Sequence, residues 1–349
     1  MDALVQIVGP TDNWVLERLA RKLAAKIPYS EFVPWKPRPT GSAQIVYYMN
    51  YALLAGPSGL VDIAFFTHLD ESQQFLERAG QVDCCVCMAK IYADWLTAQG
   101  VENVAHIPMG FDYYQYRPRL VLGVIGRLDH PRKGKHLVEA IGRLSFLEIV
   151  VTDGRVPEAQ LRDVYQRIDY VLIPATVEGG PLCLLEGLAM GKPVIAPETV
   201  GMVPEFPENP AILRYPAGDI EALTRLVTAC HEAKSKSNEL VRERTWDRWA
   251  QDHHELFVRL CRARSISIPA PSERFRFGMM AELEIPKEAD LDALEAVVDQ
   301  AAQHLYFGKD SLARSVLEEA LSRFPCLERL LPTGHRDRKP ETRHARALR

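Results

Sequence analysis

The sequence of 349 residues lacks the features that mark a membrane-spanning, secreted or zinc-binding protein. No apolar run approaches the roughly 20 residues that a membrane-spanning helix needs. The N-terminal residues show no basic segment, no long apolar core and no small-residue cleavage site. No HxxxH spacing occurs, and the adjacent His253 and His254 would point in different directions on a helix. We therefore expect a soluble cytoplasmic protein without a metal site.

An excess of one charge and a disulfide framework are absent as well. The formal net charge is -4 and the pI is near 6.2, so nothing indicates a chain that binds polyanions over its whole surface. Cys84, Cys85 and Cys87 crowd one expected strand, and the other four cysteines are scattered. Buried reduced thiols fit this distribution better than disulfide bonds.

The sequence does contain a long alternation of strand-like and helix-like segments. Its length exceeds what one hydrophobic core usually supports, so two domains and an appendage are expected. Residues 1–117 alternate strands with helices, and a second series occupies residues 118–244. This pattern predicts an α/β fold of two Rossmann-like, doubly wound domains with parallel sheets, which face each other across a cleft.

The C-terminal third differs in character. Residues 245–261 form an expected amphipathic helix that bears Trp and Phe and returns to complete the first domain. Residues 263–331 predict a helical hairpin broken at Gly308. The hairpin resembles one tetratricopeptide-like unit, and a single copy favours a packing appendage over a peptide-binding array. Residues 332–349 form a basic tail that we expect to be disordered.

The stretch EGGPLCLLEGLAMGKPVIAP, residues 178–197, joins an expected strand to an expected helix through a Gly-Gly turn. Pro181 occupies the first-turn position that proline favours, so the helix opens with free N–H groups at the ligand edge of the sheet. Glycines let a ligand approach the backbone closely, and a helix N-terminus favours an anion. The stretch therefore predicts a cradle for a phosphate or an oxyanion.

Three charged residues extend this prediction. Glu186 has apolar neighbours along its helix, and such a carboxylate needs hydrogen-bond donors, which the vicinal diol of a ribose supplies. A glutamate that reaches solvent from an amphipathic helix is an equal alternative. Arg127 and Lys133 follow the first strand of the second domain and would oppose the charge of a diphosphate. Taken alone, this loop with Arg132 and Lys135 would be a solvated basic loop.

In combination, GRLDHPRKG (126–134) and EGGPLCLLEGLAMGKPVIA (178–196) resemble the signature of retaining GT-B glycosyltransferases of the family-four type, such as phosphatidylinositol mannosyltransferases and sucrose synthases. The likeness runs from about residue 60 to 260 and includes HIPMGFDYYQYRP, which is similar to the linker between the two domains. It implies an enzyme of the EC 2.4 class, a hexosyltransferase. The enzyme would move a sugar from a nucleoside diphosphate sugar, with UDP or GDP as the nucleotide, to an acceptor hydroxyl with retention of configuration.

The resemblance also implies roles for the motif residues. Arg127 and Lys133 would bind the donor diphosphate and, with Glu178 and His68, act in catalysis. Glu178 would contact a hydroxyl of the donor sugar, and Glu186 would bind the ribose diol. The residues whose backbone would wrap the diphosphate and the sugar are Gly179, Gly180, Pro181 and Leu182.

Two residues of the first domain complete the expected site. His68, in FFTHLDE, ends a strand where the family has a histidine that reaches the donor sugar, although a lone histidine there is more often a capping or core residue. Gly9, in IVGPTDN, lies in the loop after the first strand, where the family often keeps glycines against the donor and acceptor. The first domain is shorter than is usual for the family, so the resemblance leaves the acceptor class open.

No cofactor and no metal are expected. Asp290-Leu291-Asp292 fits a helix start, where aspartate is an ordinary cap. Arg127, Lys133 and helix N–H groups would therefore stabilise the leaving group without magnesium.

Three kinds of acceptor remain open, namely a lipid-linked molecule, a small molecule and a modified DNA base. The helix at residues 14–27 carries basic residues that would contact an anionic membrane surface, which makes peripheral membrane contact one alternative; these residues are Arg18, Arg21, Lys22 and Lys26. The basic tail would instead contact nucleic acid in a DNA glycosyltransferase that acts on a hydroxymethylated base. A non-catalytic nucleotide-sugar-binding protein is the alternative from a different class.

Overall fold

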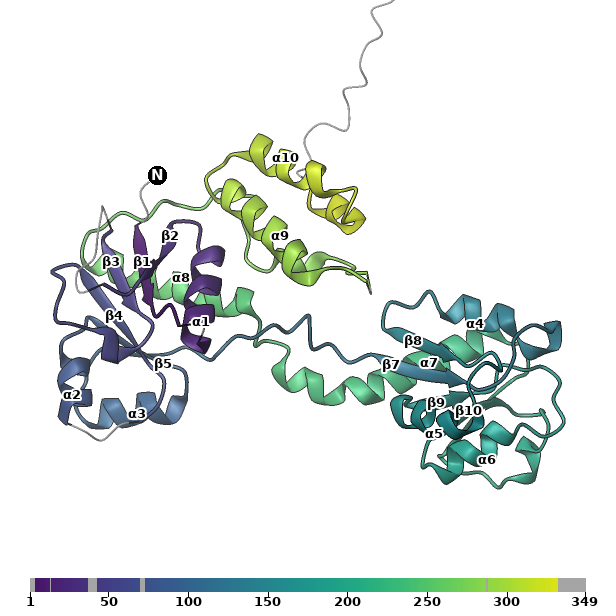
Figure 1. The fold of residues 1–349 in the computed structure, drawn as a ribbon. Helices are drawn as coiled ribbons and strands as arrows, with labels where there is room; N and C mark the ends of the chain where they lie inside the picture. The colour runs from purple at the N-terminus through teal and green to yellow at the C-terminus, as the bar shows by residue number, and fades with distance from the viewer. Residues whose placement is uncertain (1–3, 13, 37–42, 70–72, 287, 332–349) are drawn as a thin grey trace, which may run out of the picture. The chain divides into compact units, whose positions relative to one another are not determined.

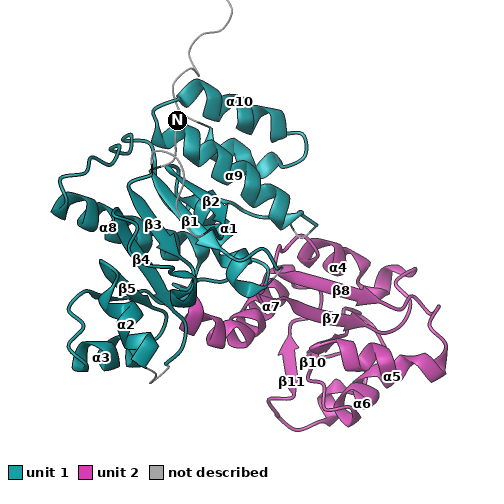
Figure 2. Ribbon diagram, turned by 60° about the vertical axis from the view of Figure 1, so that its left-hand side comes forward, with its two compact units in different colours: residues 1–115, 243–349 teal, residues 116–242 magenta. Residues whose placement is uncertain are grey.

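The computed structural model describes residues 4–12, 14–36, 43–69, 73–286 and 288–331, which form two compact units (Figures 1 and 2). Unit 1 comprises residues 1–115 and 243–349, and unit 2 comprises residues 116–242. The predicted domain boundaries differ from these limits by two residues. The α/β fold with two parallel sheets and C-terminal helices is as the sequence predicts. The basic tail lies outside the described residues.

Unit 1 is built on a six-stranded parallel sheet with the order β2-β1-β3-β4-β5-β6. Its strands are β1 (Val5–Gly9), β2 (Ser30–Pro34), β3 (Ile45–Tyr48), β4 (Val61–Phe66), β5 (Cys84–Cys87) and β6 (Val104–His106). The strand β2 lies at one edge of the sheet. This edge strand is only partly buried and ends in proline, so it lacks the continuous apolar run by which buried parallel strands are recognised.

Helices cover both faces of this sheet and form two separate apolar cores. One face packs against α1 (Val15–Lys26) and α8 (Trp246–Ala263), and the other packs against α2 (Gln73–Gly80) and α3 (Lys90–Ala98). Cys84 contributes to the first core, whereas Cys85 and Cys87 contribute to the second. Successive strand residues point to opposite faces, so the cysteine cluster is divided between two layers. Burial raises the pKa of the Cys84 thiol to about 11 and that of Cys87 to about 12.

The helix α8 returns to unit 1, as the sequence predicts, and buries its aromatic face there. Trp249 and Phe257 are almost completely buried in the core with α1. The imidazole of His253 is fully buried; its Nδ1 lies 2.8 Å from the carbonyl oxygen of Trp249 and its Nε2 lies 3.0 Å from the hydroxyl of Tyr47. A carbonyl only accepts, so Nδ1 carries the proton and Nε2 accepts from Tyr47. Burial lowers the pKa of His253 to about 4, which keeps the imidazole neutral.

The C-terminal hairpin consists of α9 (Leu291–Tyr306) and α10 (Asp310–Ala320), which turn at Gly308 as predicted. The 3-10 helices Met279–Glu282 and Pro325–Leu330 help to form its own apolar core. Asp290 is the N-cap of α9, and its carboxylate accepts a hydrogen bond from the Ala293 N–H at 3.1 Å. The capping role expected of this aspartate is therefore confirmed.

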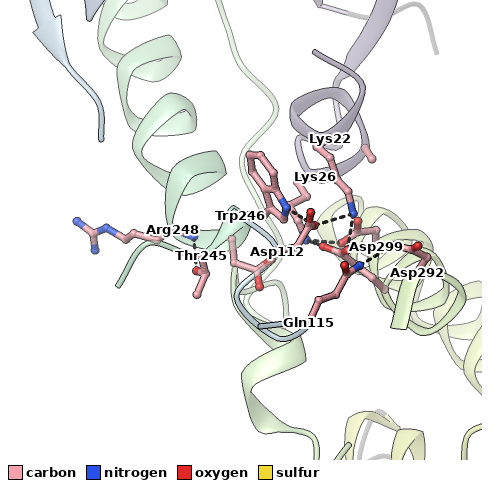
Figure 3. A network of polar contacts seen from close by, with 12 residues as sticks. Lys22, Lys26, Asp112, Gln115, Thr245, Trp246, Arg248, Asp292 and Asp299 are labelled. Atoms are coloured by element: carbon pink, nitrogen blue, oxygen red, sulfur yellow. Dashed lines mark hydrogen bonds and ion pairs between the residues drawn. The ribbon is translucent and has the colours of Figure 1, made fainter. Parts of the chain in front are cut away.

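A buried charge network joins the hairpin to the rest of unit 1 (Figure 3). The side chain of Lys26 is only 3% exposed, and its Nζ lies 2.9 Å from Asp247, 2.8 Å from Glu295 and 3.1 Å from Asp299. Lys22 lies 2.6 Å from the same Glu295. One lysine thus contacts carboxylates from both α8 and α9.

Three of the four basic residues by which α1 would contact a membrane surface are paired within unit 1. Lys22 and Lys26 point to α8 and α9 and are neutralised there, and Arg21 pairs with Glu17 at 2.8 Å. Of the four expected basic residues, only Arg18 is exposed without an ion pair in the part of the chain that the structure describes. In the same part, no helix is both long enough and apolar enough to cross a membrane.

Unit 2 is a five-stranded parallel sheet with the order β11-β10-β9-β7-β8. Its strands are β7 (Leu120–Val124), β8 (Leu147–Val151), β9 (Tyr170–Leu172), β10 (Val194–Pro197) and β11 (Ile212–Tyr215). One face packs against α4 (Lys135–Ile141) and α7 (Ile220–Ser235), and the other packs against α5 (Glu158–Arg167) and α6 (Leu182–Ala189). The strand order reverses between β7 and β9. In open α/β sheets, ligands bind at the carboxyl ends of the strands beside such a switch point.

Candidate functional site

A cavity of about 370 Å³ opens in unit 2 at this switch point. Its walls are the loops after β7, β8 and β9 together with the first turns of α6. This volume is within the range of pockets that bind small molecules. The sequence-predicted residues that line it are Arg127, Lys133, Glu178, Gly180, Pro181, Leu182 and Glu186.

The loops after β7 and β9 contact each other through their backbones. The Arg132 carbonyl accepts a hydrogen bond from the Thr176 N–H at 2.8 Å. Gly134 has a φ of 73°, and a Cβ atom at this position would lie 2.0 Å from the carbonyl oxygen of Pro174. Only glycine fits such a left-handed turn against another backbone segment. This close approach fixes the position of Lys133, which immediately precedes the glycine.

Lys133 and Glu178 form a direct ion pair within the cavity wall. The side chain of Glu178 is 19% exposed, and Arg132 lies 3.7 Å from the same carboxylate. The hydrogen bond from Lys133, assisted by the charge of Arg132, holds the pKa of Glu178 below its usual range. Glu178 is therefore ionised at neutral pH, with a fixed cation beside it.

Arg127 is the cation of the cavity that has no carboxylate partner among the described residues. Its aliphatic stem crosses Gly154, where a Cβ atom would lie 3.1 Å from the Arg127 Cγ and the φ is 68°. Glycine after β8 thus leaves space for the arginine. A guanidinium that is not already paired is available to an anion in the cavity.

The carboxylate of Glu186 is held by a tyrosine that the sequence analysis did not single out. The hydroxyl of Tyr165, on α5, donates a hydrogen bond of 2.5 Å to the Oε2 of Glu186. Burial, and then this hydrogen bond, raise the pKa of Tyr165. A buried tyrosine usually requires a partner for its hydroxyl, and that requirement was the available signal. Leu182 and Leu185 are 67% and 43% exposed, so the expected apolar surroundings of Glu186 are only partial.

The start of α6 differs slightly from the expectation. Pro181 is the N-cap residue and the helix begins at Leu182, one residue later than predicted. The cap has no side-chain hydrogen bond, so the first turn of the helix presents backbone N–H groups where it lines the cavity. The N–H of Gly179 donates to the carboxylate of Glu178 at 3.3 Å.

The remaining predicted site residues, Gly9 and His68, belong to unit 1. Gly9 ends β1 and is buried; a Cβ atom there would lie 3.0 Å from the Ala20 Cβ and 3.1 Å from the ring of Phe32, which gives the glycine a packing reason. His68 is exposed after β4, with its Nδ1 2.9 Å from the Thr67 hydroxyl. Their contacts with a donor sugar stay predictions. No cluster of three or more His, Cys, Asp or Glu side chains among the described residues is placed to hold a metal ion.

Several solved structures align along most of the chain at low sequence identity. Sucrose-phosphate synthase from Thermosynechococcus elongatus is 14% identical, with 74% of this chain and 99% of that chain covered and a TM-score of 0.35. The lipopolysaccharide outer core galactosyltransferase WaaB is 12% identical, with 73% and 99% covered and a TM-score of 0.32. HepE from Anabaena, in complex with UDP-glucose, is 11% identical, with 73% and 99% covered and a TM-score of 0.33.

A family model is more specific for the part of the chain that contains the cavity. No curated protein matches the sequence. Residues 114–232 match the family described as glycosyl transferases group 1, and this range covers nearly all of unit 2. Unit 2 therefore carries a domain that matches the group 1 glycosyltransferases.

Proposed function

We propose that the protein is a glycosyltransferase that moves a sugar from a nucleoside diphosphate sugar to an acceptor hydroxyl with retention of configuration and without a metal ion. One observation carries the proposal. The cavity at the switch point of unit 2 gathers two cations, two carboxylates and a helix N-terminus, and it lies within the segment that matches the group 1 glycosyltransferases.

The charges of the cavity fit a diphosphate. Arg127 and Lys133 line it, and Arg132 lies beside Glu178. The first turn of α6 adds backbone N–H groups that favour an anion. A diphosphate that approaches Lys133 would compete with Glu178 for the ammonium group, because these two are paired in the structure. Donor binding would therefore release the Glu178 carboxylate to accept a hydrogen bond from a sugar hydroxyl.

The proposed reaction uses these groups as follows. The bond between the anomeric carbon and the diphosphate oxygen breaks, and the acceptor oxygen bonds to the same face of the sugar. The departing phosphate takes the proton of the acceptor hydroxyl. Arg127 and Lys133 stabilise the charge that develops on the leaving group; preorganised groups of this kind typically contribute roughly 10²- to 10³-fold each in rate. The proton balance requires no metal and no further base.

The test is donor hydrolysis and transfer by the purified protein in EDTA. UDP-glucose, UDP-galactose, UDP-N-acetylglucosamine and GDP-mannose are incubated with the protein, and the released sugar and its anomeric configuration are followed by proton NMR. We expect one donor to be consumed with retention, and we expect Glu178→Ala to abolish the turnover. Glu221→Ala is the matched control, because Glu221 lies exposed on α7, on the opposite face of the sheet from α6.

The same experiment separates an enzyme from a non-catalytic nucleotide-sugar-binding protein. An enzyme turns over the donor in a Glu178-dependent way. A binding protein would bind the donor with equal affinity before and after Glu178→Ala and would release no sugar from any of the four donors. This second outcome would contradict the proposed transfer while leaving the donor site in place.

A further inference from the structure

Tyr165 contacts the cavity-lining Glu186 and has no role in the function proposed so far. It lies on α5, is 2% exposed and packs in the apolar core between the sheet and the helices α5 and α6. Its hydroxyl donates a hydrogen bond of 2.5 Å to Glu186 on α6. This hydrogen bond links α5 to α6, and one of its two partners lines the cavity.

Tyr165 contacts only the Oε2 of the Glu186 carboxylate, so the Oε1 is available to a ligand. Among the described residues, no hydrogen bond to the Oε1 of Glu186 occurs. A glutamate side chain has three rotatable bonds and loses considerable rotamer entropy when it is fixed. Tyr165 provides this fixation before any ligand arrives, so a ligand that uses Oε1 meets a preorganised acceptor.

Another buried tyrosine of unit 2 shows that the choice of partner is not imposed by burial. The hydroxyl of Tyr215, itself 2% exposed, donates to the backbone carbonyl of Ile173 at 3.2 Å. A backbone acceptor is thus sufficient to satisfy a buried phenol in this fold. Tyr165 instead uses the ionisable side chain that lines the cavity.

We propose that Tyr165 is a positioning residue that sets the selectivity of the nucleotide site for ribose over deoxyribose, by orienting the Glu186 carboxylate toward the sugar hydroxyls. This inference rests on the proposed function, in which Glu186 accepts from the ribose diol. A carboxylate that is held in one orientation distinguishes a ligand with a 2′-hydroxyl from one without it. A carboxylate that rotates freely would lose much of that distinction.

The experiment compares the affinities of UDP and 2′-deoxy-UDP by isothermal titration calorimetry, with the corresponding GDP and ADP pairs measured alongside. The wild-type protein should prefer the ribonucleotide by about 10- to 100-fold, the range expected for a hydrogen bond to a charged group. Tyr165→Phe should reduce this preference about five- to tenfold. Glu186→Ala should abolish it, and the double variant should behave like Glu186→Ala, because Tyr165 acts only through the carboxylate.

Tyr170→Phe is the matched control. Tyr170 belongs to the same unit, and its hydroxyl pairs with Cys230 in the core on the other face of the sheet. This variant should keep the full ribose preference. If Tyr165→Phe destabilised unit 2 in general, it would weaken the binding of UDP and of 2′-deoxy-UDP equally, and it would do so in the Glu186→Ala background as well. If Tyr165 positions Glu186, its replacement changes the ratio of the two affinities and has no effect in the Glu186→Ala background.

The outcomes separate the two proposals. If no nucleotide binds to the wild-type protein, the proposed function is wrong. If the wild-type protein prefers ribose and Glu186→Ala retains that preference, the role of Glu186 is wrong. If Glu186→Ala loses the preference and Tyr165→Phe keeps it, the positioning role of Tyr165 is overturned and the proposed function stands.

If the Tyr165→Phe protein fails to fold, a structure of the wild-type protein tests the proposal instead. A crystal structure of the wild-type protein with UDP should show the Tyr165 hydroxyl within 3 Å of Glu186 and the other carboxylate oxygen on the ribose. A separation of more than 3.5 Å between Tyr165 and Glu186 in that complex would overturn the inference.

Discussion

Replacement of Lys26 by methionine should destabilise unit 1 by about 3–5 kcal/mol, the cost of removing one partner from a buried ion pair. Methionine keeps the aliphatic length and removes the charge. The ammonium group lies within 3.1 Å of Asp247, Glu295 and Asp299, and its side chain is only 3% exposed. Its loss removes this partner from all three carboxylates, whereas Glu295 keeps its contact with Lys22. A loss of this size is expected because several acidic groups lose their partner together.

The pH dependence of this variant follows from Asp299. Burial, with the nearby charges of Glu295 and Asp247, raises the pKa of Asp299 to about 6 from an ordinary value of 3.8, although Lys26 opposes the shift. A raised pKa in the folded state contributes stability that is complete below the unfolded value and is lost as the pH rises through the folded value. Without Lys26 the pKa of Asp299 rises further. The destabilisation by Lys26→Met should therefore be smaller at pH 5 than at pH 8.

The assay is denaturant unfolding followed by tryptophan fluorescence. All five tryptophans of the chain lie in unit 1, so the signal reports this unit alone. Lys90→Met is the control, because Lys90 forms an exposed pair with Asp94 at 2.6 Å and such pairs contribute little. A loss of less than 1 kcal/mol in Lys26→Met at pH 8, or a larger loss at pH 5 than at pH 8, would refute the reasoning.

Four further predictions concern unit 2. Arg127→Met should weaken UDP binding about tenfold, because the guanidinium of Arg127 is assigned to the diphosphate. Uridine binding, measured by the same calorimetry, should not change. Equal weakening of UDP and uridine binding would contradict this assignment. Glu178→Gln should lower donor turnover roughly 10²- to 10³-fold with the UDP affinity within threefold of wild type. Lys133 holds the pKa of Glu178 down in the free protein, and kcat/KM reports the ionisation of the free enzyme. Protonation of Glu178 should therefore lower the kcat/KM of Lys133→Ala at a higher pH than that of the wild type, and the same pH profile in both proteins would contradict this role of Lys133. Gly134→Ala should destabilise unit 2 by at least about 2 kcal/mol, because the left-handed backbone is strained for alanine and the new Cβ atom would lie 2.0 Å from the carbonyl oxygen of Pro174. The variant should lose UDP binding, while the unfolding transition of unit 1 seen by tryptophan fluorescence stays unchanged. Normal UDP binding would contradict this constraint on the turn.

The regular pattern of the chain explains why most of the fold was predictable. Buried parallel strands such as Val61–Phe66 are continuous apolar runs, and the helix Trp246–Ala263 has a strongly amphipathic pattern. Both signals are local and can be read in one sequence. The strand Ser30–Pro34 lacks such a run, because it lies at the edge of the sheet and is only partly buried. Its pairing depends on β1, which no local pattern reveals.

In the candidate site, too, local sequence signals predicted some features, and contacts between distant residues were not predictable. Motif spacing places Arg127, Lys133 and Glu178 at one sheet edge, since loops after parallel strands meet there, and the structure brings them to one cavity. The pairing of Lys133 with Glu178 and the contact of Tyr165 with Glu186 depend on how loops and helices pack in three dimensions. Residues that lie far apart along the chain meet in these contacts, so periodicity and spacing do not indicate them.

The central claim is that the cavity of unit 2 binds a nucleoside diphosphate. Its most direct test is isothermal titration calorimetry of the whole protein with UDP, GDP, ADP and TDP, repeated with the Arg127→Met, Glu186→Ala double variant. The account predicts that at least one of these nucleotides binds to the wild-type protein with one site per chain and that the double variant loses this binding. If none of the four binds to the wild-type protein, or if the double variant binds as tightly as the wild type, the account is contradicted.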